Sequence, residues 1–588
     1  MSKSISFDRF DFGLDLRKGL STSDANRLRV LKNAHATEGR TIRKRPGTTK
    51  VATLEAGTTG LFAGNGKLNT FYGGTSTINH TNTLFKANNV RHEVDQTLVV
   101  SKVHYGDVFN GFMYASVEYS NGNIRHHYID NPSAWAASTS VSLNDVRRPT
   151  TSNGLRYKVT SVSNGLTAWA ATTAVALNQF RRPTTANGYR YESTTAGTTG
   201  ATEPIWPVTA GATVVDGSVT WTCRANAPTS ASEPTWPTTP GGTVTDGSIV
   251  WTATTSIIED ENCPNTKQVI KIASKIWAVG VNGDVVRFSA TNAPRDWTTA
   301  NDAGFLPVGL QQSGANEATA LGFYSNRLVV LFADSSQIWN VDVDPALHAF
   351  LQAVDVGSIL PYSHANMGGD VFFLSPAGVR TITRQDVTTN LIDADVGSPI
   401  DRELIAGQFI NITQAKAQYY RGGGQYWLYA GNKAVVYTFS RTASISAWSV
   451  YEFPFTLDYM DELNAELYIR SGNDVYKFDR TVKTDDGELY SVDIELAYLD
   501  FKSPGVLKQI VAMDAVVSGQ CQISHRYDPR STELVTNPPV TIQGDSRPGY
   551  LMPVELMAVS ISPVIRNYDD QEFELHMLSY FYENLAPL

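Results

Sequence analysis

The feature that most limits the fold of this chain is a repeated pattern of two short apolar strands joined by a tight polar turn. Apolar and polar residues alternate within each strand, and Gly, Asn, Asp or Pro recurs at intervals of about ten residues, which is typical of all-β proteins. Examples of the turns are Asn282-Gly283-Asp284 and Gly472-Asn473-Asp474. The pattern occurs in GLFAGNGKLNTFYGG, GDVFNGFMYASVEYSNGNIRHHYI, SKIWAVGVNGDVVRFS, NRLVVLFADSSQIWNV, GDVFFLSPAGVRTIT, GQYWLYAGNKAVVYTFS and AELYIRSGNDVYKFD.

These seven hairpins, at intervals of about forty to fifty residues, predict the blades of a β-propeller, in which each sheet covers its neighbour's face and few strand edges stay open. A series of β-sandwiches would contain similar hairpins and is the alternative fold. Composition agrees with an all-β class, because Thr, Ser, Gly, Asn and aromatic residues are abundant and long Ala, Leu, Glu or Lys runs are missing. A chain of 588 residues should divide into roughly three or four domains.

One stretch, residues 131–256, departs from this rhythm and is rich in Thr, Ala, Ser, Pro and Gly. It contains two duplications. Residues 135–157 match residues 169–191 at 16 of 23 positions, and residues 203–222 match residues 233–252 at 13 of 20. Because the stretch lies between hairpins of one type, we expect an insertion of small duplicated modules in a loop of the propeller, where insertions cost little stability.

After about Thr484 the alternation changes, and the remaining residues predict a compact, β-sandwich-like platform domain. The N-terminal strand FDRFDFGLDL needs sheet partners to bury Phe7, Phe10 and Phe12, and we expect the C-terminal sheet to supply them. The predicted domains are an N-terminal arm and platform strand (1–50), the first part of the propeller (51–130), the inserted modules (131–256), the second part of the propeller (257–484) and the C-terminal platform (485–588).

Basic charge is concentrated in residues 28–49, which hold seven basic residues, counting His35, against one acid. Residues 1–50 contain twelve Lys or Arg and five Asp or Glu, a balance of +7, so the other 538 residues carry −16 to give the total of −9. Such an arm on an acidic body indicates an acidic partner or nucleic acid, although a solvated arm without a role has the same composition. The Pro46-Gly47 turn predicts that the arginines before it are held at a chain reversal.

No motif in the sequence indicates catalysis or a cofactor. The chain lacks the nucleophile elbow, the zinc-protease motif and the phosphate loop, and its three cysteines are far apart without metal-type spacing. The first residues, MSKSISFDRFDFG, lack the apolar run of a signal peptide, and nowhere do about eighteen apolar residues run together. We therefore expect a soluble, non-enzymatic protein that is made in a cytosol.

Metal binding is not predicted either. The alternating aspartates Asp342/Asp344 and Asp393/Asp395 lack the glycine and the distal glutamate of a calcium loop, so we interpret them as strand-end turns. The dipeptide His126-His127 lies in a strand pattern, where neighbouring side chains face opposite sides, and should not share one metal ion.

The order of elements in residues 10–49 resembles the opening of the tail nozzle, or tail tubular, proteins of short-tailed bacteriophages. It comprises an aromatic strand, an arginine-bearing run, Asn33-Ala34-His35, a turn, and Lys44-Arg45-Pro46-Gly47-Thr48. The resemblance implies a homo-hexameric ring in the virion tail, attached beneath the adaptor ring that extends the portal and associated with tail fibres or spikes.

In that role the ring would enclose the channel through which viral DNA leaves without sequence recognition, and the protein would be made in the host cytoplasm. The acidic body would act as a weakly repelling wall for the DNA. The residues expected to dock on acidic groups of the adaptor or of the next subunit are Arg40, Arg43, Lys44 and Arg45.

The insertion resembles small chitinase-type carbohydrate-binding modules, with a leading Trp, an apolar strand, Arg-Arg-Pro, Asn-Gly-x-Arg-Tyr, a turn and Glu-Pro-x-Trp-Pro. Aromatic rings stack on the C–H faces of sugars. The residues that this resemblance assigns to contact with a host surface glycan are Trp206, Trp236, Trp169 and Tyr191.

The alternative is that aromatic residues form the cores of these small domains, as we expect for Trp221 and Trp251. Glu203 and Glu233 recur with the module, and we interpret them as turn or cap carboxylates. If the aromatic residues of the insertion do contact a glycan, the function that competes with the nozzle is a glycan-binding receptor adhesin or a propeller-type polysaccharide depolymerase. The catalytic carboxylates of such a depolymerase would come from scattered strands.

Overall fold

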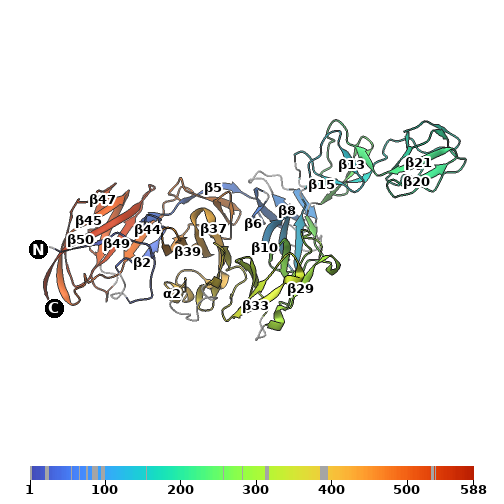
Figure 1. Cartoon of the computed structure of the whole chain (residues 1–588). Helices are drawn as coiled ribbons and strands as arrows, with labels where there is room; N and C mark the ends of the chain where they lie inside the picture. Colours follow the sequence, from blue (N-terminus) through green and yellow to red (C-terminus); the bar gives the residue numbers. More distant parts are fainter. Residues whose placement is uncertain are drawn as a thin grey trace. The chain divides into compact units, whose positions relative to one another are not determined.

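The computed structural model in Figure 1 is built almost entirely from β-strands. It describes residues 3–19, 25–54, 56–64, 66–73, 77–81, 90–93, 100–130, 132–151, 153, 155–255, 257–280, 282–311, 317–383, 395–531, 535–536 and 538–587. In that part of the chain, the helical elements include the α-helix α2 (Asp401–Ile405) and short 3-10 turns, and no helix combines the length and the apolar character needed to cross a membrane. The chain forms two compact units, one of residues 1–68 and 261–588 and one of residues 69–260.

The first unit contains a β-sandwich made from both ends of the chain. Its six-stranded sheet has the order β3-β4-β50-β45-β48, and β1 also pairs with β50. These strands are β1 (Lys3–Phe7), β3 (Ala34–Ala36), β4 (Ile42–Lys44), β45 (Val506–Ser518), β48 (Met552–Ala558) and β50 (Glu574–Pro587). β1 runs antiparallel to β50 with Ile5 opposite Tyr580. The pairing of an N-terminal strand with the C-terminal sheet is therefore confirmed, but the strand is Lys3–Phe7, and of the predicted strand FDRFDFGLDL only Phe7 belongs to it.

The facing sheet has nine strands in the order β37-β38-β39-β40-β2-β44-β49-β46-β47. Its first four strands are a meander, β37 (Lys416–Tyr420), β38 (Gln425–Ala430), β39 (Lys433–Ser440) and β40 (Ile445–Glu452). The others are β2 (Leu28–Lys32), β44 (Val492–Leu496), β49 (Ser562–Asn567), β46 (Gln520–Arg526) and β47 (Val540–Gln543). β2 joins the two groups, because it is parallel to β40 and antiparallel to β44.

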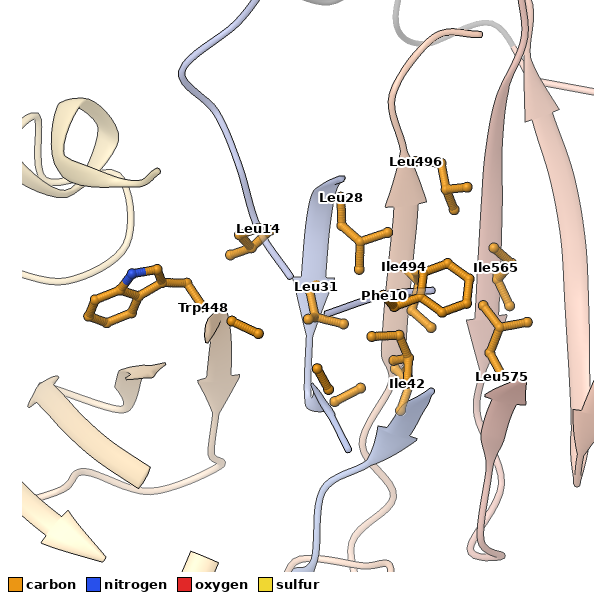
Figure 2. Packing of buried hydrophobic residues seen from close by; sticks show 14 of the residues in the cluster. Phe10, Leu14, Leu28, Leu31, Ile42, Trp448, Ile494, Leu496, Ile565 and Leu575 are labelled. Carbon is orange, nitrogen blue, oxygen red and sulfur yellow. The ribbon is translucent and has the colours of Figure 1, made fainter. Parts of the chain in front are cut away.

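The two sheets enclose one apolar core, shown in Figure 2. Ile494 and Ile565 come from the nine-stranded sheet and Leu575 from the six-stranded sheet, and all three side chains are fully buried. Phe10 reaches the same core after β1 has ended. The prediction for Phe12 is wrong: the chain turns at this point, and the ring is 46% exposed, with the guanidinium of Arg27 5.0 Å from its centroid.

The rest of the first unit consists of small antiparallel meanders of the kind that form propeller blades. One sheet contains β26 (Val269–Ile272), β27 (Lys275–Val279), β28 (Val286–Phe288) and β29 (Gly304–Leu306). A second contains β30 (Ala320–Tyr324), β31 (Arg327–Leu331), β32 (Ser336–Asn340) and β33 (Ala349–Val354), and a third contains β34 (Ala365–Met367), β35 (Asp370–Ser375) and β36 (Gly378–Thr381). The predicted all-β, propeller-type fold is confirmed.

A further blade-like sheet combines strands from distant parts of the chain. β41 (Tyr459–Leu463), β42 (Glu466–Ser471) and β43 (Asp474–Asp479) form a meander, and the tight turn between the first two has positive φ at Asn464 and Ala465. β5 (Gly47–Thr53) completes the sheet, with Gly47 opposite Asp479 and Thr53 opposite Asp474. An N-terminal strand thus closes a sheet whose other strands lie about 400 residues later in the chain.

The second unit begins with β7 (Lys67–Gly73), β8 (Thr77–Thr81) and β9 (Val90–Glu93), which are paired in sequence order. The next sheet has the order β10-β11-β12-β25, with β10 (Val100–Phe109), β11 (Phe112–Tyr119), β12 (Ile124–Ile129) and β25 (Ile257–Glu259). The chain leaves this sheet after β12 and returns as the neighbouring strand. The inserted modules therefore connect two adjacent strands of one sheet, as expected of an insertion in a blade.

The two modules are nested rather than arranged in series. The inner module, residues 166–224, contains β16 (Ala174–Val175), β17 (Phe180–Arg181), β18 (Arg190–Ser193), β19 (Gly197–Thr198), β20 (Thr213–Asp216) and β21 (Val219–Arg224). The outer module, residues 132–162 and 225–255, contains β13 (Ser140–Ser142), β14 (Val146–Arg147), β15 (Leu155–Ser161), β22 (Asn226–Pro228), β23 (Thr243–Asp246) and β24 (Ile249–Thr255). Their main sheets have the equivalent orders β17-β18-β21-β20 and β14-β15-β24-β23. In the outer module, the first copy of the first repeat (residues 135–157) thus packs with the second copy of the second repeat (residues 233–252). In the inner module, residues 169–191 pack with residues 203–222.

Candidate functional site

Arg45 is fully buried in the first unit and holds several of its segments together. Its Nη1 donates to Oδ1 of Asp485 at 2.9 Å, and its Nη2 donates to Oδ2 at 2.5 Å. Nε donates to Oδ1 of Asn33 at 3.1 Å, and Nη2 also donates to the Glu452 carbonyl at 2.8 Å. The guanidinium carbon lies 3.8 Å from the centre of the Tyr490 ring. Burial would lower the pKa of Arg45, but Asp485 outweighs burial and raises it, so this charge is paired and satisfied as a buried ion must be.

Lys44, the last residue of β4, is also fully buried. Its Nζ donates to Oδ1 of Asn567 at 3.0 Å and to the carbonyl of Asp569 at 2.5 Å. The ammonium group lies 4.6 Å from the centre of the Tyr490 ring. Burial lowers the pKa of Lys44 to about 8, although the carboxylate of Asp569 opposes this shift.

The prediction that Lys44 and Arg45 dock on another protein is therefore wrong, because both side chains are inaccessible and already paired within the chain. Charge in a sequence does not show whether a cation faces solvent. Arg43 does, since its side chain is 44% exposed, and its Nη2 lies 2.7 Å from Oε2 of Glu574. Arg40 is half-buried in the turn between β3 and β4, with a φ of 62°. Docking by Arg40 and Arg43 stays a prediction.

Arg43 and Lys44 line a cleft of about 610 Å³ in the first unit. Its walls come from the β3–β4 hairpin, the end of β39, the glycine-rich turn at residues 421–424, residues 478–483 and Glu572. The basic residues on the lining are Arg43, Lys44, Arg421, Arg480 and Lys483, and the acids are Glu38 and Glu572. The formal balance of these seven residues is five positive less two negative charges, or +3, and it is still positive, at +2, without the buried and paired Lys44, so the cleft is suited to an anion.

The cations in this cleft differ in the number of hydrogen bonds and ion pairs that they already make within the chain. Arg480 donates from Nη2 to the hydroxyl of Tyr420 at 2.8 Å and to the carbonyl of Gly422 at 2.5 Å. Lys483 is half-buried, and its Nζ makes no hydrogen bond or ion pair with any residue in the described part of the chain. Burial is the main reason that the pKa of Lys483 is lowered, while Glu572 opposes the shift.

His35 lies on the same lining, with its Nδ1 3.1 Å from the Tyr451 hydroxyl. Burial, followed by the charge of Arg43, lowers the pKa of His35 to about 4, so the ring is neutral at pH 7. Arg421 and Lys483 were not predicted from the sequence as site residues. The Gly422-Gly423-Gly424 run after Arg421 was a usable signal, because three glycines mark a close backbone approach, but no pattern surrounds Lys483.

The aromatic residues of the modules lie mostly in small hydrophobic cores. Trp169 is 9% exposed and Tyr191 is fully buried, so the prediction that these two rings contact a glycan is wrong. Trp169 donates from Nε1 to Oδ2 of Asp216 at 2.7 Å, and Trp221 donates to the same oxygen at 3.0 Å. Domains of this size need large side chains to form a core, which leaves these rings no free face.

Trp206 and Trp236 are half-buried, and each occupies the same place in its module. The Trp206 ring centre lies 4.3 Å from that of Tyr191, and the Trp236 ring centre lies 4.3 Å from that of Tyr157. Both rings therefore pack against the cores of their modules, and glycan contact by these two half-buried rings stays a prediction.

Glu203 and Glu233 hold the equivalent loops of the two modules. Oε1 of Glu203 accepts hydrogen bonds from the Thr184 amide at 2.8 Å and from Trp206 Nε1 at 2.9 Å. Oε1 of Glu233 accepts from Thr150 and Trp236 in the same way, each at 2.8 Å. The prediction of turn or cap carboxylates is confirmed.

The aspartates and histidines that the sequence brought to attention also have structural roles. Oδ1 of Asp342 accepts from the Asp344 amide at 3.1 Å, and Asp344 caps a 3-10 turn through the Ala346 amide. Asp395 lies 2.9 Å from Nε of Arg380, whereas Asp393 lies outside the described residues. The interpretation of Asp342 and Asp344 as a strand-end turn is confirmed.

His126 and His127 face opposite sides of their sheet, as predicted. The His126 ring stacks on Tyr114 with ring centres 5.2 Å apart, and Nε2 of His127 lies 2.9 Å from the Tyr119 hydroxyl. Burial lowers the pKa of each imidazole to about 3. Among the residues that the structure describes, no three His, Cys, Asp or Glu side chains are grouped so that they could hold a metal ion.

No protein-family model and no curated protein sequence matches the chain. Among solved structures, it is similar to the exo-β-1,3-galactanase of Phanerochaete chrysosporium, with 8% identity and a TM-score of 0.21 over 92% of this chain and 100% of that one. It is also similar to PorZ, an essential surface component of the type-IX secretion system of Porphyromonas gingivalis, with 10% identity and a TM-score of 0.24 over 85% of this chain and 71% of that one. At these TM-scores neither likeness carries an argument about function.

Proposed function

We propose that the protein is a structural component of a bacteriophage tail, the nozzle that assembles as a ring of six copies beneath the adaptor ring and encloses the DNA exit channel. The observation that carries this proposal is the path of residues 28–49. β2 lies in the nine-stranded sheet, β3 and β4 lie in the six-stranded sheet, and β5 completes the sheet of β41–β43. The segment whose sequence resembles nozzle proteins is therefore the one that joins the sandwich to a blade within the first unit.

The distribution of charge supports the same role. Lys44 and Arg45 are buried beside Asp569 and Asp485, so part of the basic arm does not contribute cations to the surface. The whole chain carries a formal charge of −9. An acidic wall repels phosphates weakly and lets a polyanion pass without the contacts that would hold it.

The competing function, glycan binding, depended on the aromatic residues of the insertion. Tyr191, Trp221 and Trp251 are core residues of their own modules, and Trp169 is buried and donates a hydrogen bond to Asp216 within its module. Packing accounts for these four residues, which leaves the half-buried Trp206 and Trp236 as the residues that could still favour a sugar.

The proposal is tested by the assembly state of the purified full-length protein, measured by light scattering and by electron microscopy with and without the adaptor. We expect six-fold rings of six times 64.2 kDa, about 385 kDa, that attach to the adaptor. A monomer or trimer that binds host polysaccharide would contradict the proposal.

Of the two remaining docking residues, Arg40 and Arg43, the more exposed Arg43 can be tested in the same assay. Arg43→Glu should weaken attachment to the adaptor, because the exposed guanidinium becomes a carboxylate beside Glu574. Arg402→Glu, at a side chain that is 88% exposed on α2, is the matched control. Equal attachment of both variants would remove the docking role of Arg43.

A further inference from the structure

The cleft lined by Arg43, Arg421, Arg480 and Lys483 is a pocket that the described part of the chain leaves unfilled. Its volume of about 610 Å³ falls within the range of small-ligand pockets, roughly 300–1,000 Å³. That volume accommodates a few side chains of a peptide. The balance of +3 on the lining stands against the −9 of the whole chain.

Two of the cations are available for a ligand. Arg43 is paired with Glu574, and Arg480 is bound to Tyr420 and Gly422. By contrast, within the described residues the side chains of Arg421 and Lys483 make no hydrogen bond and no ion pair. A half-buried ammonium group without a hydrogen-bond acceptor has lost part of its hydration without compensation, and an incoming carboxylate would supply the missing acceptor.

The turn that carries Arg421 is held in place before any ligand arrives. Oε2 of Glu462 accepts hydrogen bonds from the amides of Arg421 and Gly422. A side chain at position 422 would meet the carbonyl of Ala465 at 2.3 Å, and one at position 423 would meet the Tyr420 ring at 2.7 Å, so both positions require glycine. Such preorganisation lowers the entropy that binding must overcome.

The cleft suits the carboxylates of a peptide better than the phosphates of DNA. A polyanion feels the charge of the whole surface, and a chain of charge −9 repels it. A single acidic segment carries few charges and responds mainly to nearby cations, because surface interactions are screened beyond about 8 Å at physiological ionic strength. One cation of the cleft, Arg43, is already paired with a carboxylate, that of Glu574.

We infer that this cleft receives an acidic segment of a neighbouring copy of the same chain, and this inference rests on the proposed ring. The cleft lining has a formal balance of +3 and the whole chain has −9, so the other residues carry −12, and one copy presents both a basic cleft and an excess of acid elsewhere. A contact between two different patches of identical chains is head-to-tail, and such contacts generate rings when the rotation closes. Arg421 and Lys483 then act as the cations of the subunit contact.

The test compares two double variants of the full-length protein that change the net charge equally. Arg421→Glu with Lys483→Glu places two carboxylates in the cleft, and Arg402→Glu with Arg530→Glu does so at side chains that are 88% and 90% exposed elsewhere. We expect the cleft variant to raise the dissociation constant of the ring at least tenfold, measured by light scattering against concentration, and the control to leave it unchanged. Arg421→Gln with Lys483→Gln should give a smaller loss, and unchanged thermal melting of this milder variant would show that folding is intact.

A second measurement identifies the partner directly. Carbodiimide joins amines to carboxylates in contact, and rings assembled from a mixture of light and heavy isotope-labelled chains should yield cross-links between Lys483 of one label and an acidic peptide of the other. Cross-links confined to one label would overturn the inference. Rings that form equally well in both double variants would also overturn it. So would cleft variants that still form rings but no longer attach to the adaptor, because the occupant of the cleft would then be another protein.

Failure of the proposed function gives a different result. In that case the unmodified protein would form no six-fold ring at any concentration, and the inference would fall with it. If the unmodified ring forms and the cleft variants form it equally well, the proposed function stands and only the inference falls.

Discussion

The inserted modules and residues 28–49 both bury polar groups, but they satisfy them over very different distances along the chain. In the inner module, Oδ2 of Asp216 accepts from Trp221, five residues away, and from Trp169, 47 residues away. Arg45 finds its carboxylate at Asp485, 440 residues away. The modules therefore stabilise themselves locally, whereas the basic segment is stable only when the rest of the first unit has folded around it. Four predictions would break or sharpen this contrast.

The largest effect is expected for Arg45→Ala. The substitution leaves Asp485 as a buried, unpaired carboxylate, which costs about 3–5 kcal/mol of unfolding free energy. Hydrogen exchange followed by mass spectrometry should show lost protection in β2, β40 and β44 and unchanged protection in both modules. Arg402→Ala, at an exposed side chain, is the control and should change stability by less than about 0.5 kcal/mol. Similar protection in the two variants would contradict a linking role for Arg45.

The second prediction concerns pH. Burial lowers the pKa of His525 to about 4 in the folded first unit, from the ordinary 6.5. The unfolded chain therefore binds the proton first, and stability is fully present above pH 6.5 and is lost as pH falls from 6.5 towards 4. The full loss is about 3 kcal/mol for this histidine, and His35 adds to it in the same direction.

The modules provide the internal control for pH, since residues 131–256 contain no histidine. Chemical unfolding monitored by hydrogen exchange at pH 7 and pH 5 should show weakening of the first unit and little change in the modules. His525→Gln should flatten the dependence in the first unit. An equal loss of protection in the modules would show that another group is responsible.

The third prediction separates the nested modules. Asp216→Ala removes the acceptor of two buried indole N–H groups in the inner module and should cost about 1–3 kcal/mol, and Asp246→Ala should do the same to the outer module. Because each module has its own core, protection should fall only in the module that carries the substitution. Asp216→Asn keeps an acceptor and should cost less. Loss of protection in both modules from either substitution would show that they unfold as one body.

The smallest predicted effect is a gain in the stability of the modules. Ser138 and Thr172 occupy equivalent positions in the outer and inner modules and have φ of 51° and 49°. Glycine adopts this region without the strain of about 1–2 kcal/mol that other residues carry, although its greater freedom in the unfolded chain offsets part of the gain. Thr172→Gly should therefore raise the melting temperature, and by more than Ser138→Gly, because a β-branched side chain is the more strained. Lower melting temperatures for both variants would contradict the backbone strain that we assign to Ser138 and Thr172.

The same difference in distance explains which features could be predicted. Turn residues and alternation are local signals, so the hairpins and the β-sheet class were predictable, and the cap roles of Glu203 and Glu233 followed from their recurrence with the repeat. The nesting was not predictable, because the sequence allows residues 203–222 and residues 233–252 each to pair with residues 135–157 or with residues 169–191. Arg421 and Lys483 escaped notice because the cleft collects its lining from separate segments.

The sequence by itself determined the all-β architecture, the duplicated modules and the excess of basic charge near the N-terminus, because each depends on residues close together in the chain. Tertiary structure decided that Lys44 and Arg45 are buried, that Phe12 is exposed, and that Arg421 and Lys483 share a cleft with Arg43. The physical reason is that the burial of a charge depends on its partners, and for Arg45 those partners are brought together only when strands from both ends of the chain complete the same sheets.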